Sequence, residues 1–236
     1  MKNLTKLIYL MTLVFMAYGC EKDDKVTTIA DIEGNVYKTV TIGNQTWMAE
    51  NLKTTKYLDN TLIPVVTDTT AWSGLITAAC SWYRNDAANK AQYGVMYNWF
   101  AVQTGKLCPA GWHVPSDSDY NDLELYLGIK PSEVNVWGWR GTSQGAQLKG
   151  SAGWPDPVNS NTNTSGFSAL PGGYRQGAHG TFNGLGLIAI FWTSTDDSFN
   201  NKPLVAWYRR LDGLENKVHK ATTAKTGGHY IRCIKK

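Results

Sequence analysis

The sequence predicts a β-rich or α+β domain with long ordered loops. Long helical periodicity is scarce, and turn-forming residues, including 23 glycines, are spread along the whole chain. Ten tryptophans and twelve tyrosines accompany them. Because aromatic side chains bury a large area per residue, a loop-rich domain of this composition still has a substantial core.

The first half of the domain contains one predicted hairpin and one predicted helix. Residues Val36 to Met48 alternate in polarity around a Gly-Asn turn, which is typical of a β-hairpin. Residues 54–77 are polar and irregular. Residues Tyr93 to Thr104 follow helical spacing and are ended by Gly105.

A second helix is predicted after residue 116, with a clear start and end. Ser116 is expected to cap it. Asp119, three residues later, is expected to accept a hydrogen bond from the Ser116 backbone amide, as in a capping box. Apolar side chains share one face as far as Leu127, and Gly128 ends the helix.

The second half of the chain is expected to be loop and strand. Residues 137–157 are predicted to form a loop with several tryptophans, and residues 166–175 hold three glycines and a proline. Strands are predicted over 187–195 and 204–211, where alternate side chains face opposite ways. Residues 229–235 are expected to form a closing strand.

The N-terminal segment resembles a bacterial lipoprotein signal. Lys2 and Lys6 precede an apolar run from Leu7 to Ala17, and Gly19 then leads into Cys20. The run is too short to span a bilayer, which takes roughly 20 apolar residues. The resemblance implies cleavage after residue 19 and lipidation of Cys20. The alternative is an ordinary secretory signal followed by an unrelated cysteine.

The residues after Cys20 suggest where the protein is displayed. Lys22-Asp23-Asp24 resembles the surface-export tag of Bacteroidota lipoproteins, although a solvated charge run is the simpler interpretation. We expect residues 1–19 to be the signal, 20–30 a tether and 31–236 the domain. The expected location is the outer membrane, exposed on the cell surface.

The charge balance makes nucleic acid an unlikely class of partner. The formal charge of the whole chain is +4. Loss of Lys2 and Lys6 with the signal leaves a nearly neutral domain, and no basic stripe stands out.

Three cysteines other than Cys20 are present, so at most one disulfide forms among them. We expect Cys108, just ahead of a helix, to pair with Cys233 in the closing strand, which leaves Cys80 over. The alternative is three buried free thiols, since free cysteine behaves as a small hydrophobe.

Several blocks of this sequence together resemble the Fibrobacter succinogenes major paralogous domain, a module of secreted and surface proteins. Examples are YGVMYNWFAV, CPAGWHVPSDSDYNDL and FWTSTD. The six blocks occur in the family's order and cover nearly all of the domain: 34–52, 93–102, 108–123, 164–175, 191–196 and 230–236.

The resemblance carries an expectation about fold. The order WTSTD, aromatic strand and IRC is similar to the wider C-type-lectin-like superfamily. It implies an α+β fold with two helices, a small twisted antiparallel sheet and long ordered loops. About function it implies only surface exposure and a role in binding or adhesion.

Motifs for catalysis or metal binding are weak in this sequence. The calcium-dependent sugar-binding tripeptides of C-type lectins do not occur, and Asp196-Asp197 with Asn200-Asn201 favour a polar turn over a cation site. Gly141 to Gly145 matches G-x-S-x-G, with Asp156 and His219 or His229 following in hydrolase order. No buried strand is expected before Ser143, so we expect no catalytic residues, no metal and no cofactor.

Aromatic side chains in the loops are the remaining candidates for ligand binding. Trp137, Trp139 and Trp154 are predicted to lie outside the strands, with Tyr174 and Arg175 near them. Displayed rings stack on sugars and other flat apolar surfaces. The simpler alternative is that these rings fill a loop-rich core.

The sequence therefore favours a surface-anchored, non-enzymatic lipoprotein whose domain binds a glycan or a surface protein. A structural component of a larger surface assembly is the alternative, and an enzyme on the same fold is less favoured. Asp68-Thr69-Thr70 also resembles the O-glycosylation site of exported Bacteroidota proteins.

Overall fold

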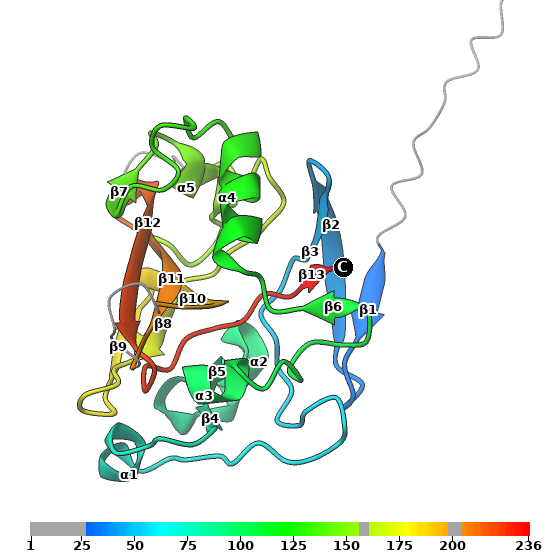
Figure 1. Cartoon of the computed structure of the whole chain (residues 1–236), viewed down its shortest axis with the longest axis vertical. Coiled ribbons are helices and arrows are strands. Elements are labelled where there is room, and N and C mark those ends of the chain that lie inside the picture. The colour runs from blue at the N-terminus through cyan, green and yellow to red at the C-terminus, as the bar shows by residue number, and fades with distance from the viewer. Residues whose placement is uncertain (1–26, 156–160, 198–203) are drawn as a thin grey trace, which may run out of the picture.

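A computed structural model describes residues 27–155, 161–197 and 204–236, and within these ranges the chain is mostly β (Figure 1). The five-stranded sheet contains, in spatial order, β1 (Thr28–Ala30), β2 (Val36–Ile42), β3 (Gln45–Met48), β13 (Ile234–Lys235) and β6 (Trp112–His113). The six-stranded sheet contains β7 (Gly138–Arg140), β12 (Glu215–Ala224), β11 (Val205–Asp212), β10 (Ile188–Asp196), β8 (Gly172–Arg175) and β9 (Phe182–Leu185). A third sheet pairs β4 (Cys80–Ser81) with β5 (Met96–Tyr97).

The helices of the described residues are short. They are α1 (Thr69–Ser73), the 3-10 helix η1 (Tyr83–Asn85), α2 (Ala87–Tyr93), α3 (Trp99–Val102), α4 (Asp117–Tyr126) and α5 (Gln144–Leu148). None of them is long and apolar enough to cross a membrane. The expected α+β fold, C-type-lectin-like with two helices beside one small sheet, is therefore wrong: thirteen strands in three sheets dominate the described residues.

The predicted helix over 93–104 shows why helical spacing misled the fold prediction. Gly94 has a φ of +88°, and a Cβ there would lie 2.9 Å from the Leu52 carbonyl oxygen. Met96 and Tyr97 then pair with β4 instead of continuing a helix. Pairing with distant strands outweighs local propensity, so only Tyr93, the last residue of α2, and the four residues of α3 are helical in this stretch.

Two other segments also differ from expectation. The stretch 137–157 was expected to be loop, yet it contains β7, which pairs with β12, and α5. β12 itself is polar at most positions and was not predicted. Only Val218, Lys220 and Ala221 of this strand are buried, so its apolar alternation is too weak to read from sequence.

Other elements are confirmed. β2 and β3 form the predicted hairpin, and α4 begins with a complete capping box between Ser116 and Asp119. β10 and β11 are the two predicted strands and pair antiparallel. Thr28–Ala30, the end of the expected tether, forms β1 against β2.

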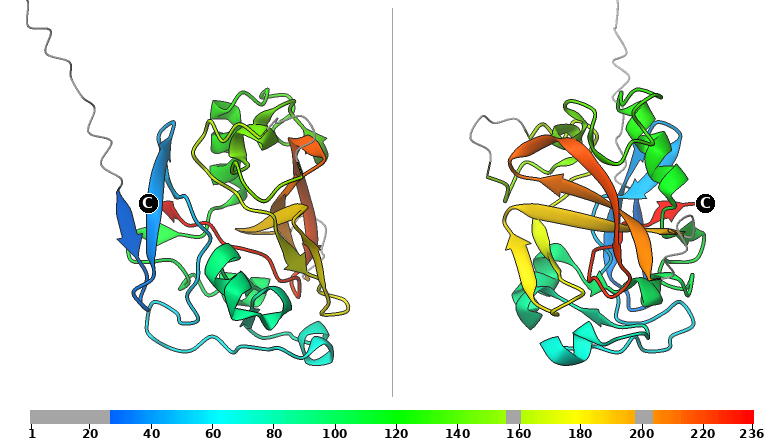
Figure 2. Two further views of the ribbon diagram at one scale, coloured as in Figure 1. Left: turned by 180° about the vertical axis from the view of Figure 1, so that it is seen from behind. Right: turned by 60° about the vertical axis from the view of Figure 1, so that its left-hand side comes forward.

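The two large sheets lie on opposite sides of the molecule, and α4 and α5 lie toward one end while α1, α2 and α3 lie toward the other (Figures 1 and 2). A buried charge cluster fastens α4 to the six-stranded sheet. Glu124 on α4 is fully buried and accepts hydrogen bonds from Arg140 of β7 and Arg209 of β11. Asp117 pairs with Arg209 and Lys220, and these cations hold its pKa below the usual range against the effect of burial.

The stretch 227–234 is buried throughout and runs between the sheets. It was expected to be one closing strand, but only Ile234 and Lys235 are assigned to β13. The preceding residues form isolated backbone hydrogen bonds with all three sheets. His229 exchanges two bonds with Tyr97 of β5, Tyr230 bonds Ile190 and Trp192 of β10, and Cys233 accepts from Met48 of β3.

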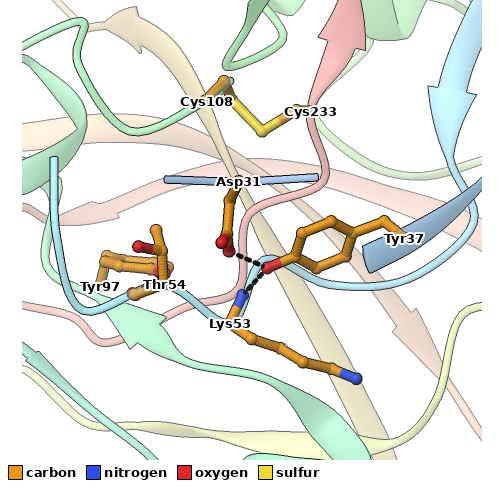
Figure 3. Close-up of a disulfide and its surroundings, with 7 residues drawn as sticks. All are labelled: Asp31, Tyr37, Lys53, Thr54, Tyr97, Cys108 and Cys233. Carbon is orange, nitrogen blue, oxygen red and sulfur yellow. Dashed lines mark hydrogen bonds between the residues drawn. A yellow bond between two sulfur atoms is a disulfide. The ribbon is translucent and has the colours of Figure 1, made fainter. Parts of the chain in front are cut away.

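The predicted disulfide between Cys108 and Cys233 is confirmed (Figure 3). Cys80 is a buried free thiol, and burial raises its pKa to about 12. Close to the disulfide, the Tyr37 hydroxyl donates to Asp31 at 2.5 Å and accepts from the Lys53 amide at 2.9 Å (Figure 3). The start of the domain is thus fixed beside the covalent link to its last strand.

Removing the disulfide should cost substantial stability. The bond joins residues 125 apart in sequence, so the Cys108→Ala/Cys233→Ala variant should lose about 4–5 kcal/mol of unfolding free energy by the chain-entropy argument. Guanidinium unfolding at pH 7 measures this loss. Cys80→Ala is the matched control, because it also removes a buried sulfur but keeps the cross-link. A loss for the double variant no larger than that of the control would contradict the prediction.

Candidate functional site

The face of the six-stranded sheet that points away from α4 carries a row of aromatic and cationic side chains. Trp139 lies opposite His219, His219 opposite Arg210, and Arg210 opposite Ile190, across β7, β12, β11 and β10. Alternate residues of a strand share one face, so this row faces opposite to the side chains that bond α4. Tyr208 precedes Arg210 by two residues and lies on the same face.

Ring contacts extend the row across the sheet. Trp139 meets His219 edge to face with centroids 4.8 Å apart, and His219 stacks on Tyr208 at 6.0 Å. Tyr208 contacts His229 at 5.9 Å, and His229 contacts Tyr174 of β8 at 6.2 Å. These five rings form a continuous strip, which we call the ring strip.

A cavity of about 220 Å³ opens beside the ring strip. It is lined by side chains from β8, β10, β11, β12 and the segments that follow β8 and precede β13: Tyr174, Gln176, Ile190, Tyr208, Arg210, Thr223 and His229. Most of these side chains combine an apolar body with a polar end. Such a lining suits a small ligand with flat faces and polar edges.

Several nitrogen atoms of this cluster lack a hydrogen-bond partner. They are Nε of Arg210, Nδ1 of His219 and both ring nitrogens of His229. Arg210 also donates through Nη2 to Asp212 at 2.5 Å. Buried polar atoms are nearly always paired in folded proteins, so a group of unpaired nitrogens beside a cavity is a feature of a binding site.

The electrostatics of the cluster are set by burial. Burial lowers the pKa of His229 to about 3, and only the nearby Gly228 backbone opposes that shift. Burial also lowers the pKa of His219, helped by the charges of Arg210 and Arg140. Both imidazoles are therefore neutral at pH 7, and Arg210 supplies the positive charge of the cavity wall.

The structure separates the five residues that the sequence singled out. Trp139, 37% exposed, belongs to the ring strip, and Tyr174 lines the cavity. Trp137 is more exposed, at 55%, but its ring packs on Trp207, whose side chain points to the other face of the sheet.

Trp154 and Arg175 are buried and not displayed. The indole of Trp154 donates to the Ala169 carbonyl at 2.8 Å. The Arg175 guanidinium donates to backbone carbonyls of Val66, Thr67 and Asp68. Both side chains hold loops together and line no part of the cavity.

The sequence missed most of the site. Tyr208 and Arg210 were placed correctly on one face of a strand, but nothing identified that face as open. His219 was missed because β12 was not predicted, and His229 because it was read as part of a strand. The sequence pattern that could have indicated the site is the alternation of histidine, tyrosine and arginine along neighbouring strands.

Other sequence candidates fall outside the cavity. Cys20, the signal and residues 20–26 of the tether lie outside the described residues, as do Asp156 and Asn200-Asn201. Asp197 is buried, and no group of three His, Cys, Asp or Glu in the described ranges is placed to hold a metal ion. Ser143 stands at the N-cap position of α5 without a side-chain capping bond, after the short edge strand β7, in which only Arg140 is buried. Thr69 and Thr70 are exposed, and Asp68 caps α1.

Comparison with known proteins gives a family assignment. The model of the Fibrobacter succinogenes major domain matches residues 40–235, which include the six-stranded sheet, the cavity and the five-stranded sheet from Val40 of β2 onward. No curated protein and no solved structure matches the chain.

The buried His229 should make stability fall in acid. Its pKa is near 3 in the folded chain and about 6.5 when unfolded. Below pH 6.5 the unfolded chain therefore binds a proton that the folded chain refuses, and stability falls until the pH reaches about 3. Between pH 7 and pH 5 this group alone should remove about 2 kcal/mol.

Urea unfolding at both pH values tests this dependence in wild type and in His229→Gln. The variant should show a pH dependence smaller by about 2 kcal/mol. His179→Gln, which replaces an exposed histidine, serves as the control and should behave as wild type does. Equal pH dependence in all three proteins would contradict the assignment.

Proposed function

The chain belongs to the Fibrobacter succinogenes major domain family, and on that basis we propose that it is a non-catalytic binding domain for glycan or protein ligands. We further propose that a lipid on Cys20 holds this domain at the outer membrane, exposed on the cell surface. The ring strip and its cavity carry the binding proposal.

The ring strip has the chemistry that carbohydrate binding requires. A pyranose ring presents an apolar face of C–H groups and an edge of hydroxyl groups. Trp139 and Tyr208 offer flat surfaces for the first, while Gln176, Thr223 and Arg210 offer polar groups for the second. Because the strip lies on strands of a paired sheet, its rings are held in place before a ligand arrives, which lowers the entropy cost of binding.

The N-terminal sequence supports the proposed location. The charged start, the short apolar run and Cys20 have the order of a lipoprotein signal, and Lys22-Asp23-Asp24 follows directly. Such a tether joins the domain at β1, the edge strand of the five-stranded sheet. Figure 1 draws this sheet on the side away from β11 and β12, so β1, the first described strand, lies away from the ring strip.

Ligand binding should depend on the ring strip. A glycan and matrix-protein array identifies ligands of wild type, and calorimetry then compares variants on one of them. Tyr208→Ala should weaken binding about tenfold or more, which corresponds to roughly 1.4 kcal/mol. Trp137→Ala is the matched control, because this exposed ring lies on the other face and its loss should leave affinity unchanged.

The array also tests the alternative of a purely structural role. Absence of any signal above a denatured control would contradict the binding proposal and favour a structural component. Equal losses in Tyr208→Ala and Trp137→Ala would place the site elsewhere.

Lipidation should decide where the protein is found. Cys20→Ala should abolish palmitate labelling and move the protein from the membrane fraction to the soluble fraction. Replacing Lys22, Asp23 and Asp24 with alanine should keep the lipid but remove accessibility to protease added to whole cells. Labelling of Cys20→Ala equal to that of wild type would contradict the anchor.

A further inference from the structure

We infer that the ring strip binds a linear polysaccharide along its length: one sugar residue enters the cavity, and another part of the same chain lies on Trp139. This inference rests on the proposed function and specifies the kind of glycan that the site takes. It comes from an exposed indole that stands outside the cavity, at the edge of the same sheet face. A ligand confined to the cavity would not reach that ring.

The cavity by itself is small for a ligand-binding site. Its volume is about 220 Å³. Pockets that enclose a whole small molecule usually measure roughly 300–1,000 Å³. Trp139 is not among the side chains that line the cavity. A ligand therefore gains further ring contacts only by continuing from the cavity over the neighbouring surface of the sheet.

The register of the strands places the ring strip straight across the sheet. From Trp139 on β7 the row passes through β12, β11 and β10 to Tyr174 on β8. These strands are consecutive in the sheet, so the two ends of the row lie roughly 19 Å apart at the usual strand spacing. A sugar residue in an extended chain is about as long as one strand spacing. A stretch of about four sugar residues therefore covers the row.

The row is open at its β7 end. β7 is an edge strand, so no further strand of the six-stranded sheet lies beyond Trp139 among the described residues. Trp139 stays exposed although its ring contacts His219 and the Arg210 guanidinium. An exposed indole offers a stacking surface and a free N–H donor. A chain that enters the cavity can therefore leave the sheet over this edge.

The polar groups along the row suit a ligand that carries many hydroxyl groups. The hydroxyls of Tyr174, Tyr208 and Thr223 line the cavity and have no hydrogen-bond partner in the described part of the chain. Each of them donates and accepts, as the hydroxyls of a sugar do. Arg210 joins the two parts of the row, because it lines the cavity and its guanidinium lies 5.8 Å from the centre of the Trp139 ring.

Oligosaccharides of increasing length test the inference. Calorimetry on the full-length chain in detergent measures the binding of cello-, xylo-, manno- and chito-oligosaccharides, each from the monomer to the hexamer. In at least one series wild type should bind the hexamer about thirtyfold more tightly than the dimer, because the longer chain also stacks on Trp139. The gain should level off at about four sugar residues, the length of the row.

Variants then assign the gain to Trp139. A hexamer contains five overlapping dimers, so repetition alone gives a preference of about fivefold. Trp139→Ala should therefore lower the preference for the hexamer over the dimer to about fivefold, and Trp139→Phe should retain part of the difference. Trp137→Ala is the matched control, because it removes an exposed indole that packs on the other face. Circular dichroism confirms that each variant is folded.

The outcomes separate this inference from the proposed function. A preference of about fivefold or less by wild type in every series shows that only one or two sugar residues are held. That result overturns the linear chain and leaves a glycan-binding cavity. An unchanged preference in Trp139→Ala, or an equal loss in Trp137→Ala, also overturns the inference.

Absence of binding in all four series overturns the linear chain as well, and the array then decides the proposed function. A signal for another ligand on the array keeps the binding function, whereas an array without any signal contradicts it. Since the length series use wild type alone, a misfolded Trp139 variant does not prevent a decision.

Discussion

The backbone hydrogen bonds of residues 227–235 hold the whole structure together. The Tyr230 amide donates to Ile190 of the six-stranded sheet, and its carbonyl accepts from Trp192. Three residues later the Cys233 carbonyl accepts from Met48 of the five-stranded sheet, and its sulfur bonds Cys108. Neither large sheet pairs directly with the other, and this buried stretch bonds to both of them.

The same stretch also contributes His229 to the lining of the cavity. Arg232 is fully buried, donates to Asn51 and to the Phe167 carbonyl, and lies over the Phe167 ring. These contacts hold the segment in register, which in turn places His229 three residues earlier beneath Tyr208. Burial lowers the pKa of Arg232 to about 10, still high enough for it to stay charged. The charged side chain of Arg232 inside the core thus fixes the neutral imidazole of His229 at the cavity.

Local signals were enough to predict the elements that local contacts form, and not enough for the rest. The hairpin over 36–48, the capped helix at Ser116 and the disulfide follow from turn, capping and cysteine chemistry. β5 interrupts the helix expected over 93–104. It pairs with β4 and with His229, and both lie outside that segment, so its local sequence does not reveal the strand. For the site, Trp139 and Tyr174 were found by residue type. Arg210 and His219 were not, because their proximity depends on the register of β11 with β12.

The position of the joining segment also determines when folding is complete. Residues 227–235 are synthesised after every element that they join, and Arg232 bonds Asn51 across 181 residues. A chain that stops short of them lacks four buried side chains of the two core clusters, Tyr230, Ile231, Cys233 and Ile234. Long-range contacts of this kind form slowly. Native packing should therefore be completed only once residues 227–235 have docked on both sheets.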